Sequence, residues 1–235
     1  MDVSVLWDFD DPAGSEARLR GAAALAEGVD REILLTQVAR ALGLRGEFDQ
    51  GHAILDGLSS DSAEAGVRAA LERGRLHRSS GSAEAAKPWF ESAADSAARA
   101  GLEGLELDAL HMVALCLDGD AALAATLAGV NRARAASTVE GRAWLASLLN
   151  NLGMAYAEGG DWDKALDAFE EALAERRERE DQSATFIARW MVAWALRNLG
   201  RVEEARAAQV ALKADLAAAG KSDPYVDEEL ALLER

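Results

Sequence analysis

The residues best suited to chemistry in this chain of 235 residues are three histidines and one cysteine. His52, His77 and His111 lack the i, i+4 spacing and the Cys/His spacing that hold metal ions. Cys116 stands in a leucine-rich helical stretch, where a buried structural thiol is common. The twenty glycines are dispersed along the chain and do not form a phosphate-binding loop. We therefore expect no catalytic residues, no bound metal and no cofactor.

The charge of the chain limits its partners. There are 41 acidic and 25 basic residues, for a formal net charge of -16. Such a charge repels nucleic acid and anionic membrane surfaces, so neither is expected as a partner. No stretch approaches the roughly 20 consecutive apolar residues that span a bilayer, and the acidic residues 1–12 lack the positive start of a secretory signal. With a single cysteine, which excludes internal disulfides, these features predict a cytoplasmic protein.

The composition also predicts the fold class. Half of the residues are apolar, yet aromatic residues make up only 6% and there are three prolines. The remaining composition is rich in Ala, Leu, Glu and Arg, which are good helix formers. An all-α protein is therefore expected, whereas the length alone is compatible with one large domain or two small ones.

A helical hairpin is clearest in the segment LLNNLGMAYAEGGDWDKALDAFEEAL, residues 148–173. Its first half has an apolar face with Tyr156, on which the small Gly153 lets another helix approach closely. Gly160 is typical of a helix end, and Asp161 is typical of the N-cap of the next helix. The apolar stripe of that second helix consists of Trp162, Ala165, Phe169 and Ala172. The segment therefore predicts two antiparallel helices.

Weaker copies of this hairpin are found when other segments of the chain are aligned on the glycine at the turn between its two helices. The turn glycines are Gly46, Gly81, Gly119, Gly160 and Gly200. By subtraction they are separated by 35, 38, 41 and 40 residues. The third copy has Ala128 where a large residue is expected, so its register stays open.

These positions resemble the tetratricopeptide repeat residue by residue. The matching residues of the clearest copy are Gly153, Tyr156, Gly160, Trp162, Ala165, Phe169 and Ala172. The basic period of that family is about 34 residues. The longer spacings seen here, with Pro88 in the run Ala86–Phe90, are similar to repeats of the kinesin light chain kind. The resemblance implies a right-handed α-α superhelix of about five hairpins.

The expected domain organisation follows from that resemblance. An N-terminal arm, residues 1–14, precedes a single solenoid domain over 15–235, and the arm is either anchored on the first helices or loose. Repeats are expected near 30–59, 61–100, 102–136, 138–180 and 183–220. An extra helix, 15–26, precedes them. A C-terminal capping helix, 224–234, is introduced by the N-cap pair Asp223-Pro224.

The resemblance also implies where a partner binds, because the first helix of each hairpin lines the concave wall in this family. The expected partner-binding residues are Arg40, Arg68, Arg75, Arg78, Asn150, Asn151, Met154, Trp190, Trp194 and Arg197. Arginine binds carboxylates and tryptophan is a frequent interface anchor, so a ligand with an acidic part and an apolar part is expected. The alternatives stay open: tryptophans four residues apart also fit core packing, and the arginines also fit a solvated face.

We therefore expect a non-enzymatic protein- or peptide-binding scaffold or adaptor. The alternatives are a self-associating structural protein, as a monomer or weak homodimer, and a peptide-sensing regulator that acts through a separate partner. The carboxylate clamp that grips chaperone tails in this family is not expected, because Ile187 and Met191 stand where it requires basic residues.

Overall fold

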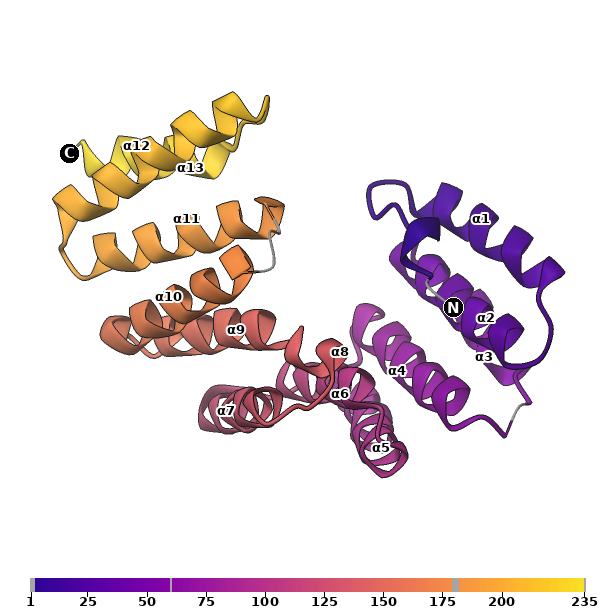
Figure 1. Cartoon of the computed structure of the whole chain (residues 1–235). Helices are drawn as coiled ribbons and strands as arrows, with labels where there is room; N and C mark the ends of the chain where they lie inside the picture. The colour runs from indigo at the N-terminus through magenta and orange to yellow at the C-terminus, as the bar shows by residue number, and fades with distance from the viewer. Residues whose placement is uncertain (1–2, 60, 179–181, 235) are drawn as a thin grey trace. The chain divides into compact units, whose positions relative to one another are not determined.

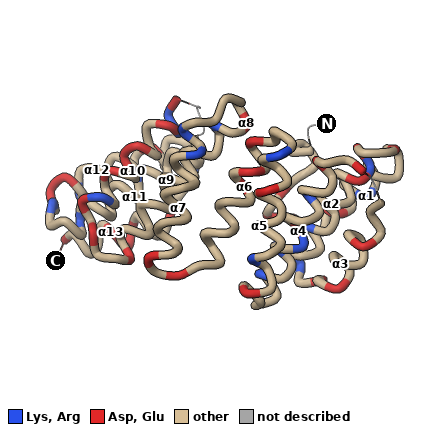
Figure 2. The backbone as a smooth tube through the Cα atoms, turned by 90° about the horizontal axis from the view of Figure 1, so that it is seen from below, with Lys and Arg blue, Asp and Glu red and all other residues tan. Residues whose placement is uncertain are grey.

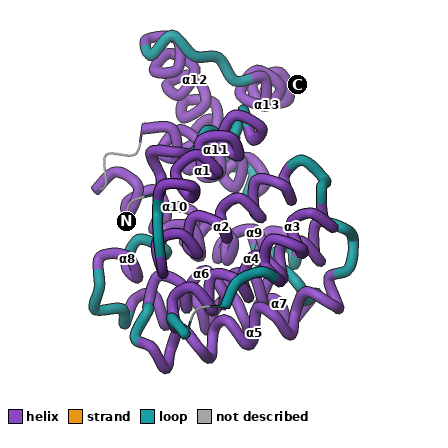
Figure 3. Tube along the Cα trace, turned by 90° about the vertical axis from the view of Figure 1, so that its right-hand side faces the viewer, coloured by secondary structure: helices purple, strands orange, loops and turns teal. Residues whose placement is uncertain are grey.

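The computed structural model of the protein describes residues 3–59, 61–178 and 182–234. Every regular element in those ranges is a helix, which confirms the expected all-α class (Figures 1 and 3). None of these described helices is both long and apolar enough to cross a bilayer. Residues 1–2 of the expected arm and residues 179–180 of the expected fourth repeat lie outside the described residues.

The chain divides into two compact units. Unit 1 is Met1–Asp118 with Ala136–Arg142, and unit 2 is Gly119–Ala135 with Ala143–Arg235. Unit 1 contains η1 (Ser4–Leu6), α1 (Pro12–Leu25), α2 (Gly28–Leu44), α3 (Phe48–Asp56), α4 (Ala63–Ser79), α5 (Ala83–Ala100), α6 (Glu103–Ala114) and α8 (Val139–Arg142). Unit 2 contains α7 (Gly119–Arg134), α9 (Leu145–Glu158), α10 (Trp162–Glu178), α11 (Gln182–Asn198), α12 (Val202–Ala218) and α13 (Pro224–Leu233).

The boundary between the units falls inside the third predicted hairpin. Its first helix, α6, belongs to unit 1, and its second helix, α7, belongs to unit 2. Within the units, α6 packs against α5 and α8, whereas α7 packs against α9. The single domain expected over 15–235 remains a prediction, because a division into two compact units does not test whether they fold as one domain.

All five predicted turn glycines have the left-handed backbone conformation. Their φ angles are 77° at Gly46, 91° at Gly81, 55° at Gly119, 79° at Gly160 and 75° at Gly200. After α9, the N–H of Asp161 donates to the carbonyl of Tyr156 at 2.9 Å, and the N–H of Gly160 donates to Ala157 at 3.0 Å. These bonds satisfy carbonyls at the helix end in the Schellman arrangement, which requires a positive φ that glycine adopts without strain.

Two hairpins, one in each unit, share the same close packing of a glycine against a phenylalanine. A Cβ atom added to Gly153 of α9 would lie 2.4 Å from Phe169 Cε1 of α10. A Cβ atom added to Gly74 of α4 would lie 2.4 Å from Phe90 Cε1 of α5. Both phenylalanines are fully buried. The glycine of the repeat is therefore a space for the aromatic ring of the following helix.

The N-terminal arm packs on the first helices of unit 1, which corresponds to the anchored alternative. Its partly buried apolar residues on the α1–α2 core are Val3, Leu6 and Trp7. The indole Nε1 of Trp7 also donates a hydrogen bond to Gln37 Oε1 of α2 at 3.1 Å. The arm is thereby held beside the middle of α2.

The helix after the arm starts earlier than the sequence suggested. We expected it from Ser15, but α1 begins at Pro12. The Asp11 carboxylate accepts a hydrogen bond from the N–H of Gly14 at 2.9 Å, and proline occupies the first helical position, where no N–H is needed. The cap therefore precedes the apolar periodicity from which the start was predicted.

The first long helix of the fourth hairpin starts later than expected, at Leu145 instead of near 138. Residues 138–142 belong to unit 1, where α8 packs against α6. The Glu103 carboxylate of α6 accepts hydrogen bonds from the backbone N–H groups of Ser137 at 2.9 Å and Thr138 at 2.7 Å. A carboxylate at the start of α8 satisfies donors that the short helix leaves unpaired, so this segment is fixed to α6.

Candidate functional site

The first helices of the three predicted hairpins that begin in unit 1 form a wall with basic side chains. Helix α4 contacts α2 on one side and α6 on the other. Basic residues gather along α4 in this largely acidic chain (Figure 2). We call this surface the α2–α4–α6 wall. A pocket of about 190 Å³ on it is lined by residues that include Arg40, Leu44, Glu72, Arg75, Arg78 and Met112.

The size of the pocket limits what it takes. A cavity of about 150 Å³ holds a benzene molecule. Sites for drug-sized ligands and cofactors span about 300–1,000 Å³. The pocket, at about 190 Å³, therefore suits one side chain or a group of similar size.

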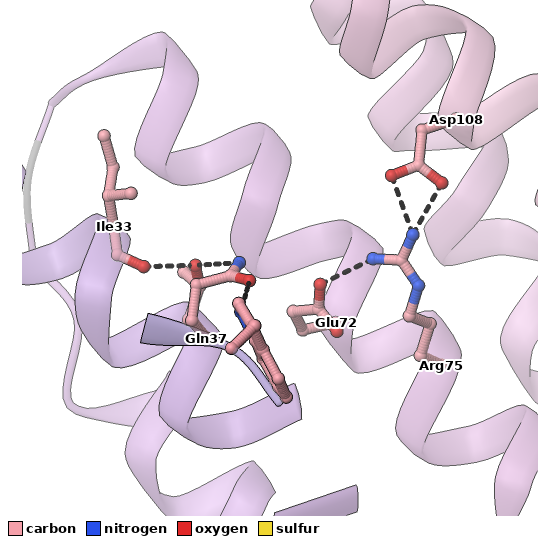
Figure 4. A network of polar contacts seen from close by, with 7 residues as sticks. Ile33, Gln37, Glu72, Arg75 and Asp108 are labelled. Carbon is pink, nitrogen blue, oxygen red and sulfur yellow. Dashed lines mark hydrogen bonds and ion pairs between the residues drawn. The ribbon is translucent and has the colours of Figure 1, made fainter. Parts of the chain in front are cut away.

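An ion-pair network that includes two lining residues of the pocket, Glu72 and Arg75, joins α4 to Asp108 of α6 (Figure 4). Arg75 Nη1 donates to Glu72 Oε1 at 2.5 Å, and Arg75 Nη2 donates to the two Asp108 oxygens at 2.5 and 2.7 Å. The side chains of Glu72, Arg75 and Asp108 are only 3%, 16% and 13% exposed. Arg75 is thus already engaged by two carboxylates of its own unit and is not free to bind a carboxylate of a partner.

Burial and pairing act in opposite directions on this network. Burial raises the pKa of Glu72, although the nearby Arg75 and Arg40 guanidinium groups oppose the shift. Burial would lower the pKa of Arg75, but the Glu72 and Asp108 carboxylates raise it above its ordinary value. The two partners differ because Glu72 is the more deeply buried and its Oε2 has no hydrogen-bond partner. Arg75 therefore keeps its positive charge, whereas Glu72 is the member of the pair whose charged form is disfavoured by burial.

Arg40 is held by the N-terminal arm. Its guanidinium carbon lies 5.8 Å from the Trp7 ring centroid and 5.7 Å from the Phe9 ring centroid. These two rings stack with centroids 4.9 Å apart and planes 8° apart. Burial lowers the pKa of Arg40, but an arginine stays protonated at neutral pH. The carboxylates of Glu72 and Asp108 are near enough to raise the pKa of Arg40 in opposition to its burial. Within the described residues, however, Arg40 forms no ion pair, so its N–H groups are available to a ligand.

The other two predicted arginines of unit 1 differ in availability. Arg78 lines the pocket, and its Nε donates only a long hydrogen bond, 3.5 Å, to the carbonyl of Leu115. Arg68 pairs with Glu64 one helical turn away at 2.9 Å, outside the residues that line the pocket. The structure thus brings together three of the four predicted arginines, namely Arg40, Arg75 and Arg78.

Sequence reasoning missed the carboxylates and the aromatic rings of this site. Glu72 precedes Arg75 by three residues, a spacing that brings side chains together on a helix. Asp108 follows Arg75 by 33 residues, which is about one repeat. Both signals were present in the sequence. The positions of Trp7 and Phe9 carried no such signal, because the arm lies outside the repeats.

The two predicted tryptophans belong to unit 2 and contact its apolar core. Trp194 meets Trp162 edge-on at a centroid distance of 4.8 Å and stacks near Trp190 at 6.0 Å. Trp190 also meets Tyr225 of α13 at 6.3 Å and packs on a cluster formed by α12 and α13. Its indole Nε1 is buried without a hydrogen-bond partner. These contacts favour a packing role, and a direct contact with a ligand stays a prediction.

Replacing Trp194 by alanine is expected to lower the free energy of unfolding of unit 2 by about 1.5–3 kcal/mol, because a large apolar contact area is lost. Urea unfolding followed by circular dichroism measures this effect. Ile187→Ala is the matched control, since Ile187 lies on the same helix and is 57% exposed, and a change within about 0.5 kcal/mol is expected there. If Trp194→Ala unfolds at the wild-type urea concentration, the tryptophan is not a core residue.

The remaining predicted residues of unit 2 are engaged within the unit to different degrees. Arg197 Nε donates to Glu229 Oε2 of α13 at 2.7 Å, and a second bond of 3.0 Å joins its Nη2 to the same carboxylate. Met154 packs partly buried against the core that contains Phe169. Asn150 and Asn151 are half-buried on α9. Their contact with a ligand stays a prediction.

The histidines and the cysteine do not form a site with a third ligand. His52 of α3 and His77 of α4 face each other with ring centroids 4.7 Å apart. Burial lowers the pKa of His52 and of His111, and burial raises the pKa of the Cys116 thiol. A raised pKa keeps the thiol protonated and weakly nucleophilic. In the described ranges no three His, Cys, Asp or Glu side chains are grouped to hold a metal ion.

Comparison with known proteins gives one family match. Residues 144–210 match the family model described as tetratricopeptide repeat, a segment that contains α9, α10, α11 and the first half of α12. No curated protein matches the sequence.

Several solved structures have the same fold. BtubC (BKLC) from P. vanneervenii aligns with a TM-score of 0.68 at 20% identity, over 93% of this chain and 94% of that protein. A putative kinesin light chain of Podosopora anserina with TPR-like repeats aligns with a TM-score of 0.60 at 17% identity, over 88% and 99%. The likeness extends the helical-repeat fold beyond the segment that the family model matches.

A further similar structure contains a peptide. The quorum sensor NprR from B. thuringiensis, in its apo form, aligns with a TM-score of 0.66 at 14% identity, over 96% of this chain and 64% of that protein. NprR in complex with its cognate peptide NprX aligns with a TM-score of 0.53 at 15% identity, over 99% and 72%. At these identities the likeness shows the fold alone.

Proposed function

We propose that this chain, whose residues 144–210 match the tetratricopeptide repeat family model, is a non-enzymatic scaffold or adaptor that binds a protein or peptide segment on the α2–α4–α6 wall. The observation that carries the proposal is the pocket on that wall, lined by Arg40 and Arg78, neither of which is held by an ion pair in the described residues. The peptide seen in the NprR complex supports it by analogy of fold.

The wall has the properties of a prepared binding surface. The Arg75 network fixes α4 against α6, and the aromatic rings of the arm hold Arg40. A ligand therefore does not have to order these side chains on binding, which saves conformational entropy. Arginine is also enriched among the few residues that dominate interface energies.

The chemistry of the pocket supports a binding role. An enzyme needs a nucleophile or acid–base group within hydrogen-bond reach of a partner group. The carboxylates of Glu72 and Asp108 are paired with Arg75, and burial raises the pKa of the Cys116 thiol. This arrangement favours recognition over bond making.

Selection of peptides from a random library on the purified full chain tests the proposal. We expect wild type to select a family of peptides, and Arg40→Ala with Arg78→Ala to weaken their binding at least about tenfold, or 1.4 kcal/mol. Arg31→Ala is the control, because Arg31 is exposed on α2 nine residues before Arg40 and so lies about half a turn round the helix. If wild type selects no peptide, or if the double variant binds equally well, the proposal is wrong.

A second candidate is a peptide-sensing regulator that acts through a separate partner. It is favoured by the likeness to NprR, a quorum sensor solved both without and with its peptide. Hydrogen exchange with a selected peptide separates the two functions. A sensor predicts altered protection in unit 2 when the peptide binds to unit 1, whereas a scaffold predicts changes on the α2–α4–α6 wall alone.

A further inference from the structure

The three arginines of the pocket differ in how many of their N–H groups donate hydrogen bonds within the protein. A guanidinium group has five N–H donors, and buried polar groups in proteins are usually hydrogen-bonded. Arg75 uses its donors on Glu72 and Asp108. In the described part of the chain, Arg40 donates no side-chain hydrogen bond and Arg78 donates only the 3.5 Å bond to Leu115. The donors of the half-buried Arg40 are therefore not committed to an acceptor of the described chain.

The aromatic rings of the arm leave these donors unused. Trp7 and Phe9 lie within the range of about 6 Å at which a ring attracts a cation. Such a contact uses the charge of the guanidinium group but none of its N–H groups. The arm thus restricts where Arg40 points, and it supplies no acceptor.

The charges around the pocket leave room for one more anion. Three guanidinium groups, Arg40, Arg75 and Arg78, face two carboxylates, Glu72 and Asp108, so one positive charge is left over. A single carboxylate would bring the site to neutrality and would accept the free N–H groups in a forked geometry.

Apolar side chains lie next to these arginines. Leu44, which lines the pocket, is 53% exposed, and Leu115, whose carbonyl meets Arg78, is 39% exposed. The buried Met112 adds an apolar part to the lining. Exposed leucines beside a charged group suit a ligand with an aliphatic neighbour next to its charge.

We infer that the pocket takes one carboxylate of an acidic peptide segment beside an aliphatic residue, that Arg40 and Arg78 are its donors, and that Phe9 and Trp7 position Arg40. This inference deepens the proposed function of the same wall and rests on it. The chemistry is shared by an aspartate or glutamate side chain and by the C-terminal carboxylate of a chain.

Three small probes separate these sources. N-acetyl-leucyl-glutamate with an amidated end carries its carboxylate on the side chain. N-acetyl-leucyl-glutamine with a free end carries it at the C-terminus, and the same compound with an amidated end carries none. Titrations of the full chain, followed by NMR through the Nε–Hε signals of its arginines, measure binding. We expect at least one charged probe to shift the Arg40 signal and to bind at least about tenfold more tightly than the neutral probe.

Variants test the two roles separately. Arg40→Lys keeps the charge but loses the forked pair of N–H donors, and it is expected to lower the affinity for the charged probe about tenfold. Phe9→Leu removes one ring, and because Phe9 is 62% exposed the fold is retained. Phe9→Leu should lower the affinity for the charged probe a few-fold, whereas Phe9→Tyr, which keeps an aromatic ring, should bind the probe as wild type does. Trp89→Leu is the control, since Trp89 lies 5.3 Å from Arg73 in a similar contact, outside the pocket lining.

The results that overturn the inference differ from those that overturn the proposed function. Equal binding of the neutral and charged probes, or an unshifted Arg40 signal, overturns the carboxylate site. If Phe9→Leu and a folded Trp7→Leu variant both bind the charged probe as wild type does, the arm does not position Arg40. Peptides selected without acidic residues leave the wall as a binding surface but reject this ligand class. A charged probe that binds while no peptide is selected rejects the proposed function instead.

Discussion

Replacing Phe169 by alanine is expected to lower the free energy of unfolding of unit 2 by about 3–5 kcal/mol, because the change leaves a cavity in a closed core. Phe169 is fully buried and fills the space above Gly153. Urea unfolding followed by circular dichroism measures the loss. The equivalent change in unit 1, Phe90→Ala above Gly74, should have a similar effect, since the two contacts have the same geometry.

The packing explanation is tested by combining Phe169→Ala with Gly153→Ala. In the wild-type chain a Cβ at Gly153 would lie 2.4 Å from the ring, so Gly153→Ala alone should cost about 1–3 kcal/mol. In the Phe169→Ala background the ring is gone, and alanine is then favoured over glycine in a helix by about 0.5–1 kcal/mol. The same cost in both backgrounds would show that the two residues do not interact as described.

Replacing Arg75 by methionine is expected to cost about 3–5 kcal/mol at about pH 7, because it leaves Glu72 and Asp108 buried without their cation. The measurement is again urea unfolding. Arg73→Met is the matched control on the same helix, because its partner Asp56 is 67% exposed and an exposed pair contributes at most about 1 kcal/mol. Equal losses in the two variants would contradict the buried network.

The pH dependence of this loss has a definite sign. Burial raises the pKa of Glu72 in the folded state above its ordinary value of 4.5, so the folded protein holds that proton more tightly than the unfolded chain. The stability that this group contributes is fully present below 4.5 and is lost as the pH rises through the folded-state pKa. Without Arg75 that pKa rises further. The deficit of Arg75→Met should therefore shrink as the pH is lowered from about 7 toward about 5.

The sequence by itself determined the helical hairpins, because their signals are local. Gly46, Gly81, Gly160 and Gly200 each lie two residues after the end of a helix, as predicted, because a helix is closed locally by a glycine in the left-handed conformation. Gly119, from the copy whose register was left open, is instead the first residue of α7. The close approach of a second helix at Gly153 was also predicted, because a residue without a side chain leaves room there, and the structure shows that the ring of Phe169 takes that room. Basic residues on the first helices were likewise predicted from helical periodicity, and Arg40, Arg75 and Arg78 meet at one pocket.

Only the tertiary structure decided how those residues are used. Asp108 neutralises Arg75 from a helix one repeat later, and the arm, which has no repeat pattern, holds Arg40. The division into two units passes through the third hairpin, where Glu103 keeps residues 138–142 with unit 1. Periodicity specifies which face of a helix is apolar, but it does not specify which charged side chains of different helices come within a few ångströms. Those contacts depend on how the helices pack. The fold therefore decided which arginine is paired with a carboxylate and which stays available to a ligand.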